Sequence, residues 1–239
     1  MRVIHIISGI SQNSGGPSRS SQGLVAALNA AGVEAWLVSC TVGERPWFPG
    51  VMHFRAPERP GLRELLFFLR TLFRDLRPSL IHLHGLWDVR IHLAATVARA
   101  ENVAYVFSPR GMLDPWAVRQ KWWKKIPAWI LYQWLDLYRA AAFHATADLE
   151  AKHIRSFGFR KKIFIVPNGV GVPDRLPQKY IEKECVRTAL FLSRLHPGKR
   201  LMMLAEAWGR VRPDGWRMRV VGFDGYGEKA RLSCMRRCI

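Results

Sequence analysis

The stretch that decides the fold is residues 3–39, which read VIHIISGISQNSGGPSRSSQGLVAALNAAGVEAWLVS. It opens with a short β-branched run that ends at Ser8, which is typical of a buried strand. A glycine-containing loop follows, then a helical pattern from Ser18 to Gly32, whose glycine suits a helix end. Residues 33–39 are a second apolar strand. This order predicts the beginning of a parallel, doubly wound α/β sheet.

The same alternation continues along the first 170 residues. The predicted strands cover 80–84, 103–107, 143–145 and 163–166, and the predicted helices cover 62–74, 89–100, 120–142 and 147–157. Pro127 leaves open whether the third of these helices is one helix or two. The pattern therefore predicts one complete Rossmann-like domain over residues 1–170.

The composition changes after this domain. Residues 171–186 contain Pro173 and Pro177 in a charged, weakly apolar run, which indicates a linker. Over residues 187–239 the alternation restarts with a strand, a helix and a strand at 188–193, 201–211 and 216–222. One helix cannot cover both faces of a doubly wound sheet. We therefore expect only the truncated start of a second Rossmann-like domain.

The overall composition limits the classes of partner and compartment. The net charge of +19 favours phosphate-bearing partners, namely nucleotides, nucleic acid or anionic lipid, or else reflects a solvated basic surface. Four scattered cysteines fit a reducing compartment without disulfides. No apolar run is long enough for a secretory signal or a membrane span. We therefore expect a cytoplasmic protein.

The first candidate binding element is the loop that contains Gly15 and Gly16, between the first strand and the first helix. Glycines allow close approach of a ligand to the backbone, and a helix N-terminus attracts phosphate. A plain strand-to-helix turn needs the same residues. The dinucleotide fingerprint G-x-G-x-x-G and the Walker lysine motif are both absent from the sequence.

Two histidines mark the end of the strand at 80–84. His82 and His84 alternate to one face of this strand, and His84 lies at its carboxyl end, where open α/β sheets bind ligands. No carboxylate or third histidine shares their spacing, so we expect no metal. A role for His84 in positioning substrate and a role as a buried, hydrogen-bonded histidine both remain open.

Cations follow two other strand ends. Arg110, beside Gly111, follows the strand at 103–107 and is placed to hold an anion or a sugar hydroxyl, unless it is a surface arginine in a turn. Arg194 and Lys199 follow the first strand of the second unit, where two cations can neutralise a diphosphate leaving group. A solvated basic turn is the competing interpretation. We expect these strand ends to meet Gly16 and His84 across one crevice.

One segment combines basic and aromatic residues on a predicted helix. Its candidate membrane-contact residues are Lys121, Trp122, Trp123, Lys124 and Lys125. Interleaved Lys and Trp fit binding at an anionic membrane surface, and they equally fit an ordinary helix whose Trp face is core.

Several motifs together resemble the retaining GT-B glycosyltransferases of family 4, in their exopolysaccharide and lipopolysaccharide branch. They are GGP at 15–17, HLHGLWD at 82–88, SPRGMLDPWA at 108–117, LYRAAAFHATADLEAKHIRSFG at 137–158, IFIVPNGV at 163–170, LFLSRLHPGKR at 190–200 and VVGFDGYGEKARL at 220–232. The resemblance implies a hexosyltransferase that moves a sugar from a nucleotide-diphosphate sugar to a glycan or lipid-linked acceptor with retained configuration. It implies no cofactor and no metal. We expect Arg110 and His84 to be the catalytic residues. Arg194 and Lys199 would bind the donor diphosphate, and Gly15 and Gly16 would contact donor phosphate or acceptor.

The sequence departs from this family at three points. Many relatives have a histidine where Arg110 stands, and relatives usually have glycine after the lysine that is followed here by Arg200. The family's later pair of glutamates has no counterpart after Gly222, and residues 233–239 match no family segment. We therefore expect a fragment that transfers sugar poorly by itself. The alternative is a non-catalytic basic α/β module that binds anionic membrane or nucleic acid, although no nucleic-acid motif is present.

Overall fold

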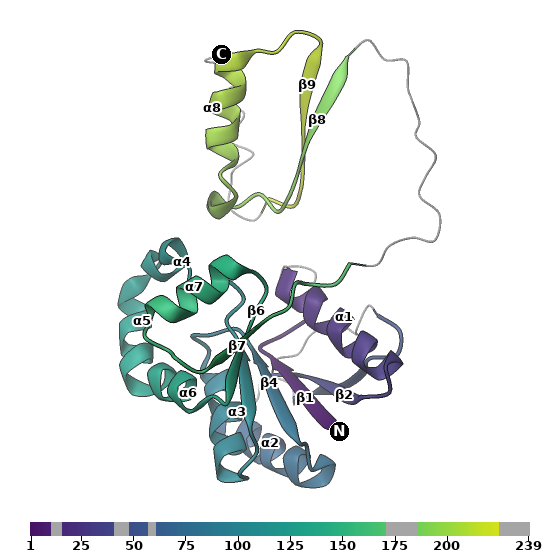
Figure 1. The fold of residues 1–239 in the computed structure, drawn as a ribbon, viewed down its shortest axis with the longest axis vertical. Coiled ribbons are helices and arrows are strands. Elements are labelled where there is room, and N and C mark those ends of the chain that lie inside the picture. Colours follow the sequence, from purple (N-terminus) through teal and green to yellow (C-terminus); the bar gives the residue numbers. More distant parts are fainter. Residues whose placement is uncertain (11–15, 41–47, 57–60, 171–185, 225–239) are drawn as a thin grey trace. The chain divides into compact units, whose positions relative to one another are not determined.

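The structure, a computed structural model, describes residues 1–10, 16–40, 48–56, 61–170 and 186–224. The chain divides into two compact units, Met1–Gly171 and Val172–Ile239 (Figure 1). The predicted linker lies outside the described residues, apart from Val186. Residues 225–239, which include the segment 233–239 that matches no family segment, also lie outside them.

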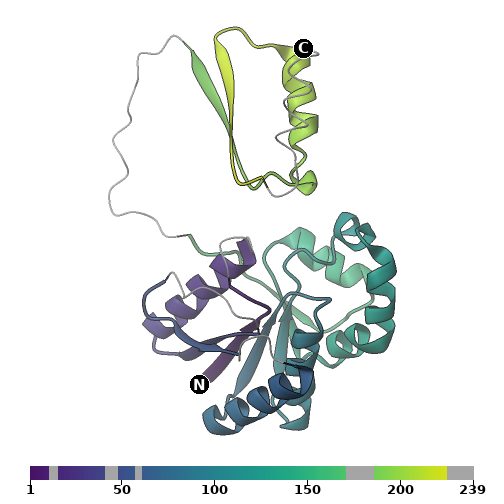
Figure 2. The same ribbon diagram turned by 180° about the vertical axis from the view of Figure 1, so that it is seen from behind.

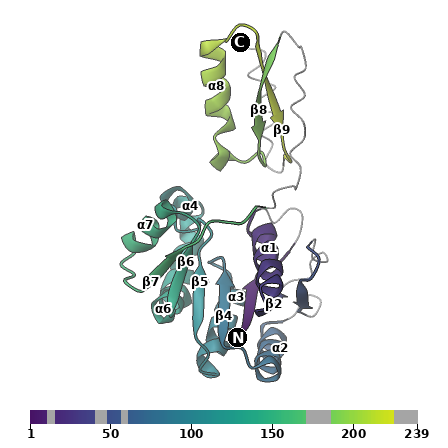
Figure 3. The same ribbon diagram turned by 45° about the vertical axis from the view of Figure 1, so that its right-hand side comes forward.

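The first unit is built on one seven-stranded sheet in the order β3-β2-β1-β4-β5-β6-β7, in which every neighbouring pair is parallel. The strands are β1 (Arg2–Ile7), β2 (Glu34–Ser39), β3 (Met52–Arg55), β4 (Leu80–His84), β5 (Tyr105–Ser108), β6 (Ala142–Ala145) and β7 (Lys162–Ile165). Figure 3 shows β4 to β7 side by side in this order. This arrangement confirms the predicted α/β class with a parallel sheet.

The helices of the first unit connect these strands as crossovers. They are α1 (Gly16–Ala30), α2 (Leu62–Leu76), α3 (Val89–Ala100), α4 (Pro115–Arg119), α5 (Trp122–Ala128), the π-helix η2 (Trp129–Gln133), α6 (Trp134–Arg139) and α7 (Asp148–Ser156). Two of these helices have an aspartate as N-cap. The carboxylates of Asp88 and Asp114 accept backbone N–H groups at the starts of α3 and α4.

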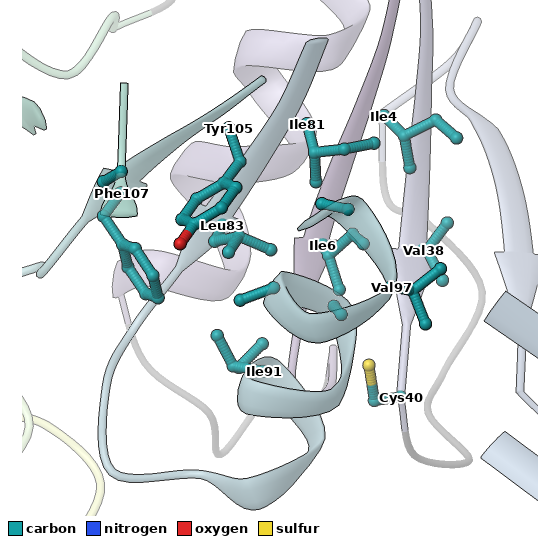
Figure 4. Close-up of a cluster of buried hydrophobic side chains, with 14 of the residues drawn as sticks. Ile4, Ile6, Val38, Cys40, Ile81, Leu83, Ile91, Val97, Tyr105 and Phe107 are labelled. Atoms are coloured by element: carbon teal, nitrogen blue, oxygen red, sulfur yellow. The ribbon is translucent and has the colours of Figure 1, made fainter. Parts of the chain in front are cut away.

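Alternate residues of β1 and β4 divide the sheet into two different faces. Ile4, Ile6, Ile81 and Leu83 lie in one large apolar cluster with Phe107 and residues of α2 and α3 (Figure 4). On the other face, Ile7 and Leu37 pack with Val25 of α1 in a smaller cluster. On β1, β4 and β6 this second face also carries buried histidines, and on β5 it carries Ser108.

The second unit, as described, contains β8 (Arg187–Leu192), the 3₁₀ turn η3 (Pro197–Lys199), α8 (Leu201–Val211) and β9 (Trp216–Val221). β8 and β9 are parallel and form a two-stranded sheet. A Cβ added at Gly222 would lie 1.7 Å from the carbonyl oxygen of Ser193, so the backbones beyond these strands meet where only glycine fits.

The structure differs from the predicted elements in three places. β3 and α4 were not predicted, because β3 (MHFR) has no apolar run and no buried residue, and α4 has only five residues. The predicted helix at 120–142 spans 122–139 as α5, η2 and α6, which follow one another without a break, and Pro127 lies inside α5. Among the described helices, none is both long and apolar enough to cross a membrane.

Candidate functional site

The carboxyl ends of β1, β4, β5 and β6 bring a row of polar side chains onto one face of the sheet. We call it the polar strip; its members are His5, His82, His84, Ser108 and His144. His5 pairs in register with His82, and His84 pairs with Ser108. Each of the five is at most 9% exposed. Adjacent imidazole rings lie 4.2–5.4 Å apart between centroids, so the histidines contact one another directly.

Burial keeps these histidines neutral at physiological pH. It lowers the pKa of His5 from 6.5 to about 3, and the nearby Arg110 cation lowers it further in the same direction. Burial also holds the pKa of His82 and of His84 well below 6.5, and it lowers that of His144. Neutral imidazole has one donor and one acceptor nitrogen, so hydrogen-bond partners decide the tautomers.

Arg110 lies directly after β5 in a left-handed backbone conformation, with φ of 56°. Its Nη2 is 3.1 Å from Nδ1 of His84, and its Nη1 donates to Oδ1 of Asn168 at 2.8 Å. Among the described residues it forms no ion pair. The sheet edge therefore holds a partly buried guanidinium with no carboxylate bonded to it, which suits an anionic ligand.

A buried carboxylate holds the loop that carries Arg110. Glu150 of α7 accepts the backbone N–H of Gly111 at 2.7 Å. Its other oxygen accepts the backbone N–H and the hydroxyl of Thr146 at 2.7 and 2.8 Å. Glu150 does not bond to the guanidinium itself, although its charge opposes the effect of burial on the pKa of Arg110. The carboxylate thus fixes the loop and leaves the cation available.

The hydrogen bonds assign the tautomers of the strip. Arginine has only donors, so Nδ1 of His84 is an acceptor and the proton of His84 is on Nε2. That Nε2 lies 3.1 Å from Nδ1 of His5 and donates to it. The proton of His5 is consequently on Nε2, which is buried and has no partner among the described residues. The hydroxyl of Ser18, in the first turn of α1, is also unpartnered there.

The strip contains a three-histidine cluster that could in principle hold a metal ion. One ring nitrogen from each of His5, His82 and His84 lies within 4.8 Å of the others. A ligating histidine normally donates its other N–H to an acceptor. The other nitrogen of His84 faces the guanidinium of Arg110, which is a donor, so His84 cannot hold both Arg110 and a cation. The geometry favours the hydrogen-bond network.

Reasoning from sequence missed part of this cluster. The prediction that there is no metal rested on the absence of a third histidine near His82 and His84, and β1 supplies that histidine as His5. The same reasoning missed His144, Glu150 and Asn168. The sequence VIHII contained a signal for His5. Successive side chains of a strand point to opposite faces, so His5 lies on the same face as Ile7, which packs against α1. The absence of a metal requirement stays a prediction.

The predicted glycine loop is described only in part. Gly15 lies outside the described residues, whereas Gly16 is the first residue of α1. A Cβ added at Gly16 would meet nothing within 4 Å. The first turn of α1 contains no acidic residue that would repel an anion.

The predicted diphosphate-binding residues lie in the second unit, after the end of β8. Arg194 and Lys199 are both exposed, and neither forms an ion pair among the described residues. The Nδ1 of His196 accepts the backbone N–H of Gly198 at 3.0 Å and shapes the turn between them. Their convergence with the polar strip stays a prediction.

The predicted membrane-contact residues fall into two groups. Trp122 and Trp123 are 56% and 58% exposed, and Lys121 and Lys124 are exposed as well. The Nζ of Lys125 instead bonds to the carbonyl oxygen of Ala117 and lies 5.6 Å from the centre of the Trp87 ring. Lys125 is therefore turned toward the protein, and burial lowers its pKa.

Comparisons with known proteins agree with this architecture. Residues 15–169 match the family of glycosyl transferase 4-like domains. No curated protein matches the chain. The fold is similar to that of sucrose-phosphate synthase from Thermosynechococcus elongatus, with 14% identity, a TM-score of 0.69 and coverage of 99% of this chain and 67% of that one.

Two further solved structures share the fold. Anabaena HepE in complex with UDP has 18% identity and a TM-score of 0.67, over 99% of this chain and 65% of that chain. The lipopolysaccharide outer core galactosyltransferase WaaB has 15% identity and a TM-score of 0.61, over 99% and 65% of the two chains. At such identities the likeness shows the GT-B fold. The chain spans about two thirds of the length of these proteins.

Proposed function

The chain belongs to the family of glycosyl transferase 4-like domains, and we propose that it takes part in the transfer of a sugar from a nucleotide-diphosphate sugar to a glycan or lipid-linked acceptor. The transfer retains the configuration of the sugar and serves polysaccharide or cell-envelope synthesis. The observation that carries this proposal is Arg110, a partly buried cation at the strand ends with no ion pair among the described residues. Solved structures of the same fold include one that holds UDP.

In this proposal Arg110 binds an anionic or hydroxyl group of the substrates, and His84 positions Arg110. His84 is a poor candidate for a general base, because its Nδ1 already accepts from Arg110 and its pKa lies well below 6.5. The bond from His84 fixes the direction of the guanidinium, and Asn168 fixes it from the other side. A group held in this way loses little conformational freedom when substrate binds.

Arg194 and Lys199 are assigned to the donor diphosphate. When the bond between the sugar and the diphosphate breaks, the diphosphate leaves with the bonding electron pair and gains negative charge. Two nearby cations stabilise that charge. Neither side chain has an ion-pair partner to give up among the described residues. We further propose that no metal or cofactor takes part, because the charge of the leaving group can be neutralised by arginine and lysine.

Calorimetric titration of the full chain with UDP, GDP and ADP tests the proposal. It also distinguishes a glycosyltransferase from the alternative, a non-catalytic basic module. We expect one diphosphate to bind, with an affinity about tenfold or more lower in Arg194→Gln/Lys199→Gln, since each charge-assisted bond contributes about 1.5–3 kcal/mol. Arg63→Gln/Arg70→Gln on α2 removes the same charge elsewhere and should bind as the wild type does. Equal affinity in all three proteins, or binding of DNA without any diphosphate binding, would reject the proposal.

A further inference from the structure

The continuous helix over α5, η2 and α6 exposes an uncharged apolar surface to solvent. We call this surface the apolar face; it consists of Trp122, Trp123, Ile126, Pro127, Ile130, Leu131, Trp134, Leu135 and Tyr138, all exposed. Ile130 is 73% exposed and Leu131 is 78% exposed. Large apolar side chains that are contiguous and this exposed mark an interaction surface. In Figures 1 and 2 these helices follow one another along the outer side of the first unit.

The apolar face consists of two parallel rows. One row runs from Trp122 to Tyr138 and the other from Trp123 to Leu135, each taking every fourth residue. In an α-helix of 3.6 residues per turn, a row of every fourth residue winds slowly around the axis. The π turn at Trp129–Gln133 is wider and rotates less per residue than an α-helix. It therefore reduces this winding, and the two rows stay on one side of the helix. By the rise of 1.5 Å per residue, the face is about 25 Å long.

The opposite side of this helix is fixed to the rest of the first unit. The backbone N–H of Trp87 donates to Gln133, which is buried, at 2.7 Å. Asp136, also buried, accepts from Arg99 at 2.7 Å and lies 2.9 Å from His92. The helix thus already has a core side, and the apolar face is a second apolar side.

The exposed charges on this helix and directly before it have one sign. Arg119, Lys121, Lys124 and Arg139 are exposed and flank the apolar face. The one acidic residue of the helix, Asp136, is on the buried side and is paired with Arg99. An apolar face with Trp and Tyr and a basic margin has the composition of helices that lie in the interface of an anionic bilayer. In a symmetric pair of this chain, the same basic margins would face each other and repel.

We propose that the apolar face docks on the surface of a membrane that contains anionic lipid. The Trp and Ile side chains enter the boundary between headgroups and acyl chains, and Lys121 and Lys124 contact lipid phosphates. The proposal rests on this surface alone and holds whether or not the chain transfers sugar.

Flotation of the full chain with vesicles tests the proposal. The vesicles are pure phosphatidylcholine or phosphatidylcholine with 30% phosphatidylglycerol. We expect binding to the anionic vesicles, reduced about tenfold or more in Ile130→Ser/Leu131→Ser, since each exposed side chain that becomes buried contributes substantially to binding. Lys121→Gln/Lys124→Gln should lose about thirtyfold, since each of the two lysines near an anionic surface contributes about 1 kcal/mol. Phe67→Ser, which changes an apolar side chain that is 73% exposed on α2, should bind as the wild type does.

Three results would overturn the proposal. The first is no flotation with anionic vesicles by a chain whose circular dichroism shows that it is folded. The second is equal flotation with both kinds of vesicle, which would remove the role of charge. The third is a wild-type dimer in solution that Ile130→Ser/Leu131→Ser converts to a monomer, which would assign the face to a second copy. All substitutions are at exposed positions, so thermal melting should match the wild type and exclude unfolding as the cause.

Discussion

The Nη2 of Arg110 lies 3.1 Å from Nδ1 of His84, and so links the loop after β5 to the last residue of β4. The same guanidinium donates to Asn168 through Nη1 at 2.8 Å. A cation held from two sides, with no ion pair among the described residues, is pre-oriented for an anionic ligand. Three segments far apart in the sequence build this arrangement.

Arg110→Gln should weaken binding of a nucleotide sugar about tenfold or more, because it removes a charge-assisted bond of about 1.5–3 kcal/mol. Arg110→Lys should not restore binding, because a lysine cannot present forked donors to His84, Asn168 and a ligand together. Calorimetric titration with nucleotide sugars measures both effects, with Arg70→Gln as the exposed control. Full binding by Arg110→Lys would show that only the charge matters there.

The polar strip should make the first unit sensitive to acid. The unfolded chain takes up protons on His5 below its usual pKa of 6.5, whereas the folded chain does so only near 3. The free energy of unfolding should therefore be unaffected by His5 above pH 6.5 and should fall as the pH drops from 6.5 toward 3. Each such histidine contributes a slope of about 1.4 kcal/mol per pH unit, well below pH 6.5.

Urea unfolding between pH 7.5 and 5 measures this slope. His5→Gln should lower it by about one histidine's contribution, whereas His153→Gln, outside the polar strip, serves as the control. An unchanged slope in His5→Gln would mean that His5 accepts a proton in the folded chain as easily as in the unfolded one.

Sequence patterns predicted the fold better than the site. The strands and crossover helices follow from local periodicity, and the ends of parallel strands must lie at one edge, so His84 and Arg110 could be placed there. The sequence does not state strand order or register. His5 was therefore missed, although it lies beside His82, and Glu150 was read only as a helical residue. The π turn also has no local signature in the sequence, and it decides which side of α6 faces solvent.

Glu150→Gln should destabilise the first unit by about 1–3 kcal/mol, because the amide keeps one accepting oxygen and turns its NH2 group toward one of the two N–H groups that the carboxylate accepts. It should also loosen the loop of Arg110. Urea unfolding measures the first effect, and amide exchange at Gly111 measures the second. Glu206→Gln is a matched control on the exposed side of α8. Unchanged protection at Gly111 would contradict the role given to this carboxylate.

Gly222→Ala should disrupt the second unit, because its Cβ would lie 1.7 Å from the carbonyl oxygen of Ser193 and the backbone must move. Amide exchange of β8 and β9 should rise strongly, with the first unit unchanged. Gly169→Ala is the control, since a Cβ there meets nothing within 4 Å. Equal amide exchange in both variants would mean that the backbones at Gly222 and Ser193 move apart without destabilising the second unit.

In the proposed function the turn with Arg194 and Lys199 binds the donor diphosphate, and Arg110 binds an anionic or hydroxyl group of the substrates. Nuclear magnetic resonance of the isotope-labelled full chain, titrated with UDP or with whichever diphosphate binds in calorimetry, tests it most directly. We predict shifts of the Arg110 Nε–H, of the backbone N–H of Gly16 and of the signals of Arg194 and Lys199, with those of α2 unchanged. Shifts confined to other surfaces, or saturation without any change at these residues, would contradict the account.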